Sequence, residues 1–109
     1  MICEPWDVVV VPFPFTERSQ TKRRPAVVLS HPEFNQNGYT ILSMITTRTH
    51  APWPGDTTLG DFQIAGLKLP CIARLKLFSL DNRLISKKIG ALSSEDQQQV
   101  HASLRRYLI

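Results

Sequence analysis

The chain has 109 residues, of which 42% are hydrophobic and 20% are charged, so it fits one ordered domain rather than two domains or a disordered segment. Its net charge of +4 favours a polyanionic partner such as nucleic acid, although many simple soluble domains are equally basic. Two cysteines and three scattered histidines are too few for a disulfide framework and lack zinc-site spacing. With no secretory signal pattern and no apolar run of about 20 residues, we expect a cytoplasmic protein with a single domain over residues 1–109.

Short segments rich in Val, Ile, Leu and Thr alternate along most of the chain with turns that contain Gly, Pro and Asn. The first segment holds four consecutive valines and must end or run along a sheet edge at Pro12 and Pro14, because proline donates no ladder hydrogen bond. The predicted strands cover residues 7–15, 25–30, 39–46, 57–64, 70–78 and 84–89. Residues 16–22 and 31–38 are predicted loops. Strands of this length and spacing indicate a mainly β fold, either an antiparallel barrel or a sandwich.

The C-terminal segment has the pattern of one amphipathic helix. Ser93 and Asp96 form a capping-box-like pair at its start, and Arg105 and Arg106 lie where the helix dipole favours cations. The apolar residues that recur every four positions, and that we expect to face the sheet, are Val100, Leu104 and Leu108.

The sequence lacks the common catalytic motifs. It has no G-x-S-x-G, P-loop or G-x-G-x-x-G motif and no acidic pair suited to magnesium, so an enzyme with this sequence is expected to use no metal and no organic cofactor. Basic and hydroxyl side chains remain at the predicted strand ends. One group is Arg18, Lys22, Arg23 and Arg24, and the other is Thr46, Thr47, Arg48 and Thr49. Taken singly, the first group is best explained as a solvated basic loop, and the second as threonines that favour a strand.

Several short motifs follow one another in a characteristic order. The first is Asp7, four valines, Pro-Phe-Pro-Phe and Thr16, and the second is Arg23-Arg24-Pro25-Ala26-Val27-Val28-Leu29-Ser30. The later ones are Ile45-Thr46-Thr47, Trp53-Pro54-Gly55-Asp56, Ala65-Gly66-Leu67, Lys76-Leu77-Phe78-Ser79-Leu80-Asp81 and Lys88-Ile89-Gly90. Each motif is weak alone, but together they span nearly the whole chain. In this order they resemble the MazF/PemK-like toxins of type II toxin–antitoxin systems.

The resemblance implies a small SH3-like antiparallel β-barrel with a C-terminal helix, usually paired as a homodimer. It also implies metal-independent endoribonuclease cleavage of single-stranded RNA, restrained by a cognate antitoxin protein. The implied catalytic residues are Arg24 and Thr46. An arginine fork can hold two phosphate oxygens, and a threonine hydroxyl can donate to the same group while the RNA 2′-hydroxyl attacks phosphorus. Pro25 restricts Arg24 to extended geometry.

Further basic, aromatic and hydroxyl residues are expected to bind RNA around this pair. They are Lys22, Arg23, Phe15, Thr47, Arg48, Arg74 and Lys76. Phe15 is equally well explained as a core or rim aromatic. Because Arg74 and Lys76 are two positions apart, they should share one face of their strand.

The chain departs from the family pattern at three places. Trp6-Asp7 replaces the usual Gly-Asp, so we expect a different turn before the first strand. Arg48 replaces a common glutamine, and Ala73-Arg74-Leu75-Lys76 replaces an acid-Gln-x-basic arrangement, which leaves base preference open. Two alternatives also stay open: a non-enzymatic gyrase-poisoning toxin of the CcdB type, and an inactive nucleic-acid-binding barrel.

Overall fold

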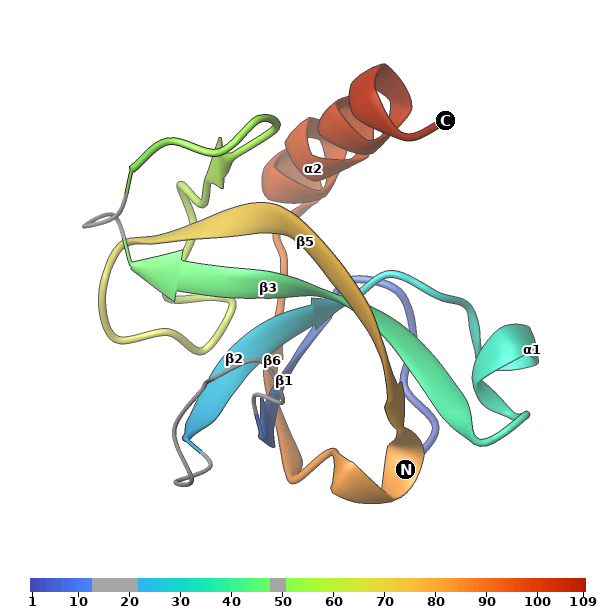
Figure 1. Ribbon diagram of the computed structural model, residues 1–109. Helices are drawn as coiled ribbons and strands as arrows, with labels where there is room; N and C mark the ends of the chain where they lie inside the picture. Colours follow the sequence, from blue (N-terminus) through green and yellow to red (C-terminus); the bar gives the residue numbers. More distant parts are fainter. Residues whose placement is uncertain (13–21, 48–50) are drawn as a thin grey trace.

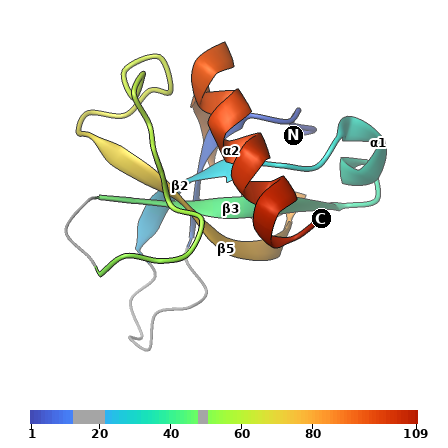
Figure 2. The same ribbon diagram turned by 90° about the horizontal axis from the view of Figure 1, so that it is seen from above.

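The fold is a curled antiparallel sheet crossed by a C-terminal helix (Figures 1 and 2). The computed structural model describes residues 1–12, 22–47 and 51–109. Within these ranges the strand order is β4-β5-β3-β2-β1-β6. The strands are β1 (Asp7–Pro12), β2 (Arg23–Val28), β3 (Tyr39–Thr47), β4 (Thr57–Thr58), β5 (Cys71–Asp81) and β6 (Lys87–Ala91). The helical elements are α1 (Pro32–Asn35), the 3-10 turn η1 (Asn82–Leu84) and α2 (Ser94–Tyr107). The predicted mainly β fold with a C-terminal helix is confirmed.

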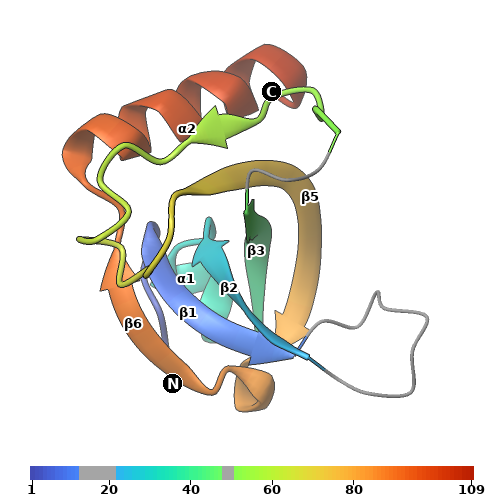
Figure 3. The same cartoon turned by 90° about the vertical axis from the view of Figure 1, so that its left-hand side faces the viewer.

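The sheet curls into a half-barrel because its longest strand, β5, bends. Leu77 pairs with Ser43 and Arg74 pairs with Met44, so two residues of β5 between these pairs have no partner on β3. Extra residues on one strand increase local twist and bend that strand. The bend is visible in Figure 3, where β5 arches over β3 and around the interior of the half-barrel.

Two apolar clusters cover the two faces of the sheet. The inner cluster lies inside the half-barrel and includes Val9 and Val28. The outer cluster, which includes Val8, Val27 and Val100, lies between the sheet and α2. Neighbouring residues of β1 and β2 divide between the clusters because successive side chains point to opposite faces. Both faces of β1 are therefore covered, as the run of four valines predicts.

Helix α2 follows the predicted pattern except at its end. The Ser93 hydroxyl caps it by accepting a hydrogen bond from the Asp96 N–H at 3.2 Å, and Val100 is buried. The Asp96 carboxylate accepts hydrogen bonds from the N–H groups of Gly60 and Asp61, at 3.1 and 3.0 Å, and so fixes that loop over the sheet. The expectation that Leu108 faces the sheet is wrong, since Leu108 follows the helix and is 52% exposed.

One predicted strand is largely wrong, and another begins later than predicted. The segment predicted over residues 57–64 is a strand only at Thr57–Thr58, and turns follow because Asp96 holds residues 60 and 61. In the segment predicted over residues 84–89, Leu84 belongs to η1 and the strand starts at Lys87. The predicted loop over residues 31–38 contains the short helix α1. Among the described residues, no helix is long and apolar enough to cross a membrane.

Candidate active site at the open end of the half-barrel

Three strands start or stop at one end of the half-barrel, which we call the open end. Here β1 ends at Pro12, β2 begins at Arg23 and β3 ends at Thr47. Pro12 pairs with Arg23, and Thr47 pairs with Cys71 at the start of β5. Figure 3 faces the side of the molecule to which these strand ends belong. The side chains that the sequence singled out at strand ends are therefore gathered at one place.

Arg24 and Thr46 lie on neighbouring strands at this end. The β2–β3 pairing runs from Val28–Leu42 to Ala26–Met44, and Arg24 and Thr46 each lie two residues beyond the last of these pairs. Alternation puts both side chains on the inner face, where Val11, the partner of Arg24 on β1, also lies. Thr46 is buried and Arg24 is half-buried. The topology thus puts both predicted residues on the inner face at the open end.

Arg74 belongs to the same face. It pairs with Met44, while Thr46 pairs with Ile72, so Arg74 is the diagonal neighbour of Thr46 across the β3–β5 ladder. Diagonal neighbours have Cα atoms about 7–8 Å apart, within reach of a long side chain. Three adjacent strands therefore bring Arg24, Thr46 and Arg74 together.

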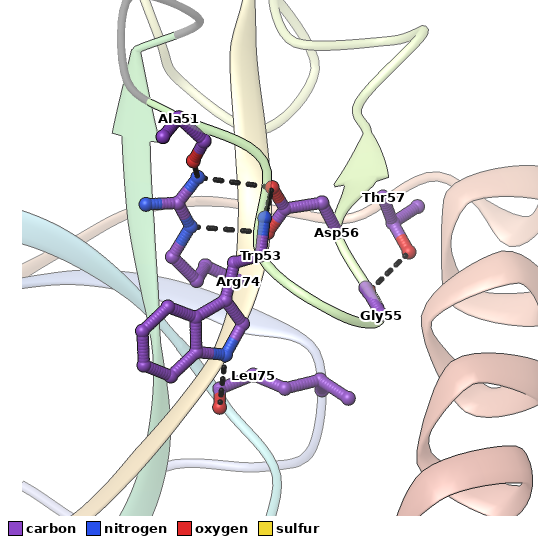
Figure 4. Close-up of polar contacts among 7 residues, drawn as sticks. All are labelled: Ala51, Trp53, Gly55, Asp56, Thr57, Arg74 and Leu75. Carbon is purple, nitrogen blue, oxygen red and sulfur yellow. Dashed lines mark hydrogen bonds and ion pairs between the residues drawn. The ribbon is translucent and has the colours of Figure 1, made fainter.

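The guanidinium of Arg74 is held by a loop that returns toward β5 (Figure 4). Its Nε and Nη2 donate to the two carboxylate oxygens of Asp56 at 3.0 and 2.9 Å, and Nη2 also donates to the Ala51 carbonyl at 3.0 Å. The Arg74 side chain is only 9% exposed. This bidentate pair fixes the loop, and it leaves Arg74 less available to a ligand than an exposed arginine.

The other predicted RNA-binding residues occupy different positions. Arg23, which alternates with Arg24, turns away from the inner face, and its Nη1 donates to the Ser86 hydroxyl. Lys22, Thr47 and Lys76 are exposed. Phe15 and Arg48 lie outside the described residues.

Arg74 and Lys76 do not follow simple strand alternation. Leu75 and Lys76 are the two residues of β5 without partners on β3. Both cations nevertheless reach one aromatic ring: Arg74 Cζ lies 5.9 Å and Lys76 Nζ lies 4.7 Å from the centre of the Trp53 indole. Trp53 and Asp56 belong to one sequence motif, but the pattern predicts no role for either residue, because they contact Leu75 and Arg74, about twenty positions away.

The turn before β1 is made by Trp6, the residue that replaces the usual glycine. Trp6 has a φ of 74°, in the left-handed region that costs a non-glycine residue roughly 1–2 kcal/mol. Its N–H donates to the Val28 carbonyl at 2.7 Å, its carbonyl accepts from the Leu92 N–H at 2.9 Å, and its ring packs on the outer cluster. The backbone of Trp6 thus takes a conformation that glycine favours, and a different turn from that of the family stays a prediction.

In the part of the chain that the structure describes, neither cysteine is activated as a nucleophile. Burial, and then the nearby Asp7 carboxylate, raises the pKa of the Cys3 thiol, and burial raises the pKa of the Cys71 thiol. Both thiols therefore stay protonated at neutral pH. Asp7 pairs with Lys88 at 3.0 Å, and this hydrogen bond raises the pKa of Lys88. Among the described side chains, no three His, Cys, Asp or Glu residues form a group that could hold a metal ion.

The sequence profile of PemK-like, MazF-like toxins of type II toxin–antitoxin systems matches residues 4–108. The chain belongs to this family. The family resemblance was based on motifs spread over nearly the whole chain rather than on one site. The profile matches over the same range. A comparison with curated proteins gives no significant match.

Solved structures of such toxins have the same fold. A MazE–MazF structure (Form-III) from Deinococcus radiodurans is 23% identical, covers 99% of this chain and 97% of its own, and has a TM-score of 0.78. A MazF structure (Form-I) from that organism is 24% identical, with coverages of 99% and 97% and a TM-score of 0.75. The Mycobacterium tuberculosis toxin MazF-mt6 is 14% identical, with coverages of 92% and 93% and a TM-score of 0.71.

Proposed function

We propose that this MazF/PemK-family toxin is an endoribonuclease that cleaves single-stranded RNA, with Arg24 and Thr46 as its catalytic residues. The observation that carries the proposal is the register of β2 and β3, in which Arg24 and Thr46 each lie two residues beyond the Ala26–Met44 pair, toward the open end. Family membership supports the activity. Arg74, which is buried and paired with Asp56, lies diagonally across the ladder from Thr46 on the same face.

The proposed reaction is a transesterification. The RNA 2′-oxygen forms a bond to the adjacent phosphorus, the bond from phosphorus to the 5′-oxygen breaks, and the proton of the 2′-hydroxyl is replaced by one gained at the 5′-oxygen. The products are a 2′,3′-cyclic phosphate and a free 5′-hydroxyl. Because RNA supplies the nucleophile, the protein has to orient the phosphate and stabilise the charge that develops on its oxygens.

Arg24 and Thr46 suit these two tasks. A guanidinium presents its donors in a rigid fork that matches two phosphate oxygens, and Pro25 restricts the backbone of Arg24 beside it. The Thr46 hydroxyl can donate to a third oxygen. Arginine stays protonated at neutral pH, so we assign Arg24 to charge stabilisation rather than to proton abstraction.

We further propose that the chain binds a cognate antitoxin and pairs as a homodimer. A Deinococcus radiodurans relative of the same fold was solved as a MazE–MazF pair, and a mycobacterial endoribonuclease was solved with its cognate antitoxin. The antitoxin is expected to restrain cleavage. Where a short reading frame adjoins the gene, its co-expression followed by copurification tests this part independently of the chemistry.

The activity is tested with purified protein and single-stranded RNA. Replacing Arg24 with Ala should lower the cleavage rate roughly 10²–10³-fold, which is typical for the loss of one preorganised donor. Arg83→Ala is the matched control, because Arg83 is exposed and pairs with Asp81 at the other end of β3. If folded Arg24→Ala protein cleaves as fast as the parent, the assignment of Arg24 is wrong.

The mechanism is tested with the substrate. A single 2′-deoxy sugar at the cleaved position should stop cleavage, because the attacking oxygen is gone. A gyrase-poisoning toxin would stop growth and leave RNA intact, and a binding module would hold both substrates equally. Either result would contradict the proposed reaction.

A further inference from the structure

We propose that the indole of Trp53 is a stacking platform for an unpaired base of the RNA strand, beside the catalytic pair. The inference rests on the proposed single-stranded RNA substrate and adds a subsite to it. Trp53 is 40% exposed, although it is large and apolar. Exposed aromatic rings beside a basic groove are the common means by which proteins hold single-stranded nucleic acid.

The ring is held rigidly by its edge and backbone. Its Nε1 donates to the Leu75 carbonyl at 3.2 Å, and its backbone N–H donates to the Asp56 carboxylate at 3.0 Å (Figure 4). The Asp56 carboxylate is in turn fixed by Arg74. A platform that is already ordered loses little conformational freedom when a base stacks on it.

The loop that carries Trp53 is also fixed by its own backbone. Pro54 restricts φ directly after the tryptophan. Gly55 has a φ of 83°, and a Cβ at this position would overlap the Leu75 side chain, so the loop packs tightly against β5. The Thr57 hydroxyl lies 3.2 Å from that of Ser103 on α2 and secures the other end of the loop.

Two cations lie beside the ring, and the exposed one, Lys76, can provide the phosphate contact that such a subsite needs. Arg74 Cζ and Lys76 Nζ lie 5.9 and 4.7 Å from the ring centre. Arg74 is kept in place by Asp56, whereas Lys76 is exposed and carries its charge on a flexible stem. Lys76 can therefore move from the ring to a phosphate when a base takes its place.

The ladder connects this platform to the catalytic pair. Arg74 contacts the Trp53 ring, and it is also the diagonal neighbour of Thr46 on the inner face. A strand whose phosphate lies at Arg24 and Thr46 can thus pass Arg74 and lay a nearby base on the indole. The platform should contribute affinity, and base preference would follow from how strongly each base stacks.

The test uses short 2′-deoxy oligonucleotides that cannot be cleaved: an adenine oligonucleotide and an abasic one of equal length and charge. Trp53→Leu should weaken binding of the adenine oligonucleotide roughly 5- to 100-fold, the range for loss of one stacked base. It should leave binding of the abasic oligonucleotide unchanged. Tyr39→Leu is the matched control, because Tyr39 is 49% exposed and begins β3 at the opposite end.

Tryptophan fluorescence gives a second readout, since the chain contains only Trp6 and Trp53. Adenine oligonucleotide should quench the parent's emission, and Trp53→Phe should lose this quenching while it keeps most of the affinity. The platform is contradicted if parent and Trp53→Leu bind the adenine oligonucleotide equally well. It is also contradicted if Trp53→Leu loses the same affinity for both oligonucleotides, or if Tyr39→Leu loses as much affinity as Trp53→Leu. Because the probes are not cleaved, these results are independent of whether Arg24 and Thr46 perform catalysis.

Discussion

The two ends of β3 are held by different kinds of polar contact. At the end opposite the open end, which we call the far end, Thr40 Oγ1 donates to Asn82 Oδ1 at 2.6 Å, and Asn82 Nδ2 donates to the Asn35 carbonyl at 2.7 Å. Asn35 Nδ2 donates to the Cys3 carbonyl at 2.8 Å. These groups are neutral and buried. At the open end, by contrast, Lys22, Arg23 and Arg24 lie at the start of β2, and Lys22 and Arg23 are exposed.

This difference indicates that Thr40 of β3 stabilises the fold, whereas Thr46 serves the proposed chemistry. A buried neutral network in which each polar group has a partner specifies one structure and offers nothing to a ligand. Cations gathered at strand ends repel one another, so their presence at one place is better explained by an anionic ligand than by stability. Replacing threonine with valine at each end of β3, in turn, separates the two roles.

The largest expected effect is that of Thr46→Val on catalysis. Valine keeps the shape of threonine but removes the hydroxyl proposed to donate to the phosphate. We expect cleavage to fall roughly 10²–10³-fold, or about 3–4 kcal/mol of transition-state stabilisation, with little change in the free energy of unfolding. Single-turnover cleavage and urea unfolding measure the two quantities. A variant that loses stability but cleaves normally would reverse the assignment of the open end.

Thr40→Val should have the opposite result. It leaves the buried Oδ1 of Asn82 without its donor, which typically costs about 1–3 kcal/mol. The midpoint of urea unfolding should therefore fall, while the cleavage rate of the folded protein stays within about twofold of the parent. Unchanged stability would show that the far end does not depend on this network.

The smallest effect concerns the Asp81–Arg83 pair at the surface of the far end. Hydrogen bonds from the side chain and backbone of Arg83 lower the pKa of Asp81 from 3.8 to about 2. Because the unfolded chain then binds more protons, stability should fall as the pH drops from about 4 to about 2. An NMR titration should give the low pKa, and Asp81→Asn should remove this small, salt-sensitive part of the acid dependence. A titration midpoint near pH 4 for Asp81 would contradict its pairing with Arg83.

The sequence predicts the buried strands and the helix well, because their signals are local. The four valines of β1 and the Ser93 cap each depend on residues within a few positions. The strand predicted over residues 57–64 fails because its partner is Asp96, far along the chain, and that contact turns the backbone away from the sheet. Local propensity contains no information about such a partner.

Prediction of the candidate site from the sequence is limited in the same way. Arg24 and Thr46 were selected through ordered motifs, and their proximity follows once the β2–β3 register is known. The Asp56–Arg74 pair and the Trp53 platform depend on the irregular pairing in β5, where two residues lack partners. Simple alternation predicts a regular strand there, so neither the buried arginine nor its hold on the loop could be derived from the pattern.

The two edge strands of the sheet affect how readily another molecule can add a strand to it. β4 has only two residues, and β6 begins with the exposed Lys87 and Lys88. Short or lysine-bearing edge strands are poor templates for the addition of a strand from another molecule. The β6 edge is therefore protected against edge-to-edge aggregation, whereas β4 pairs with β5 only at Ile72 and Ala73.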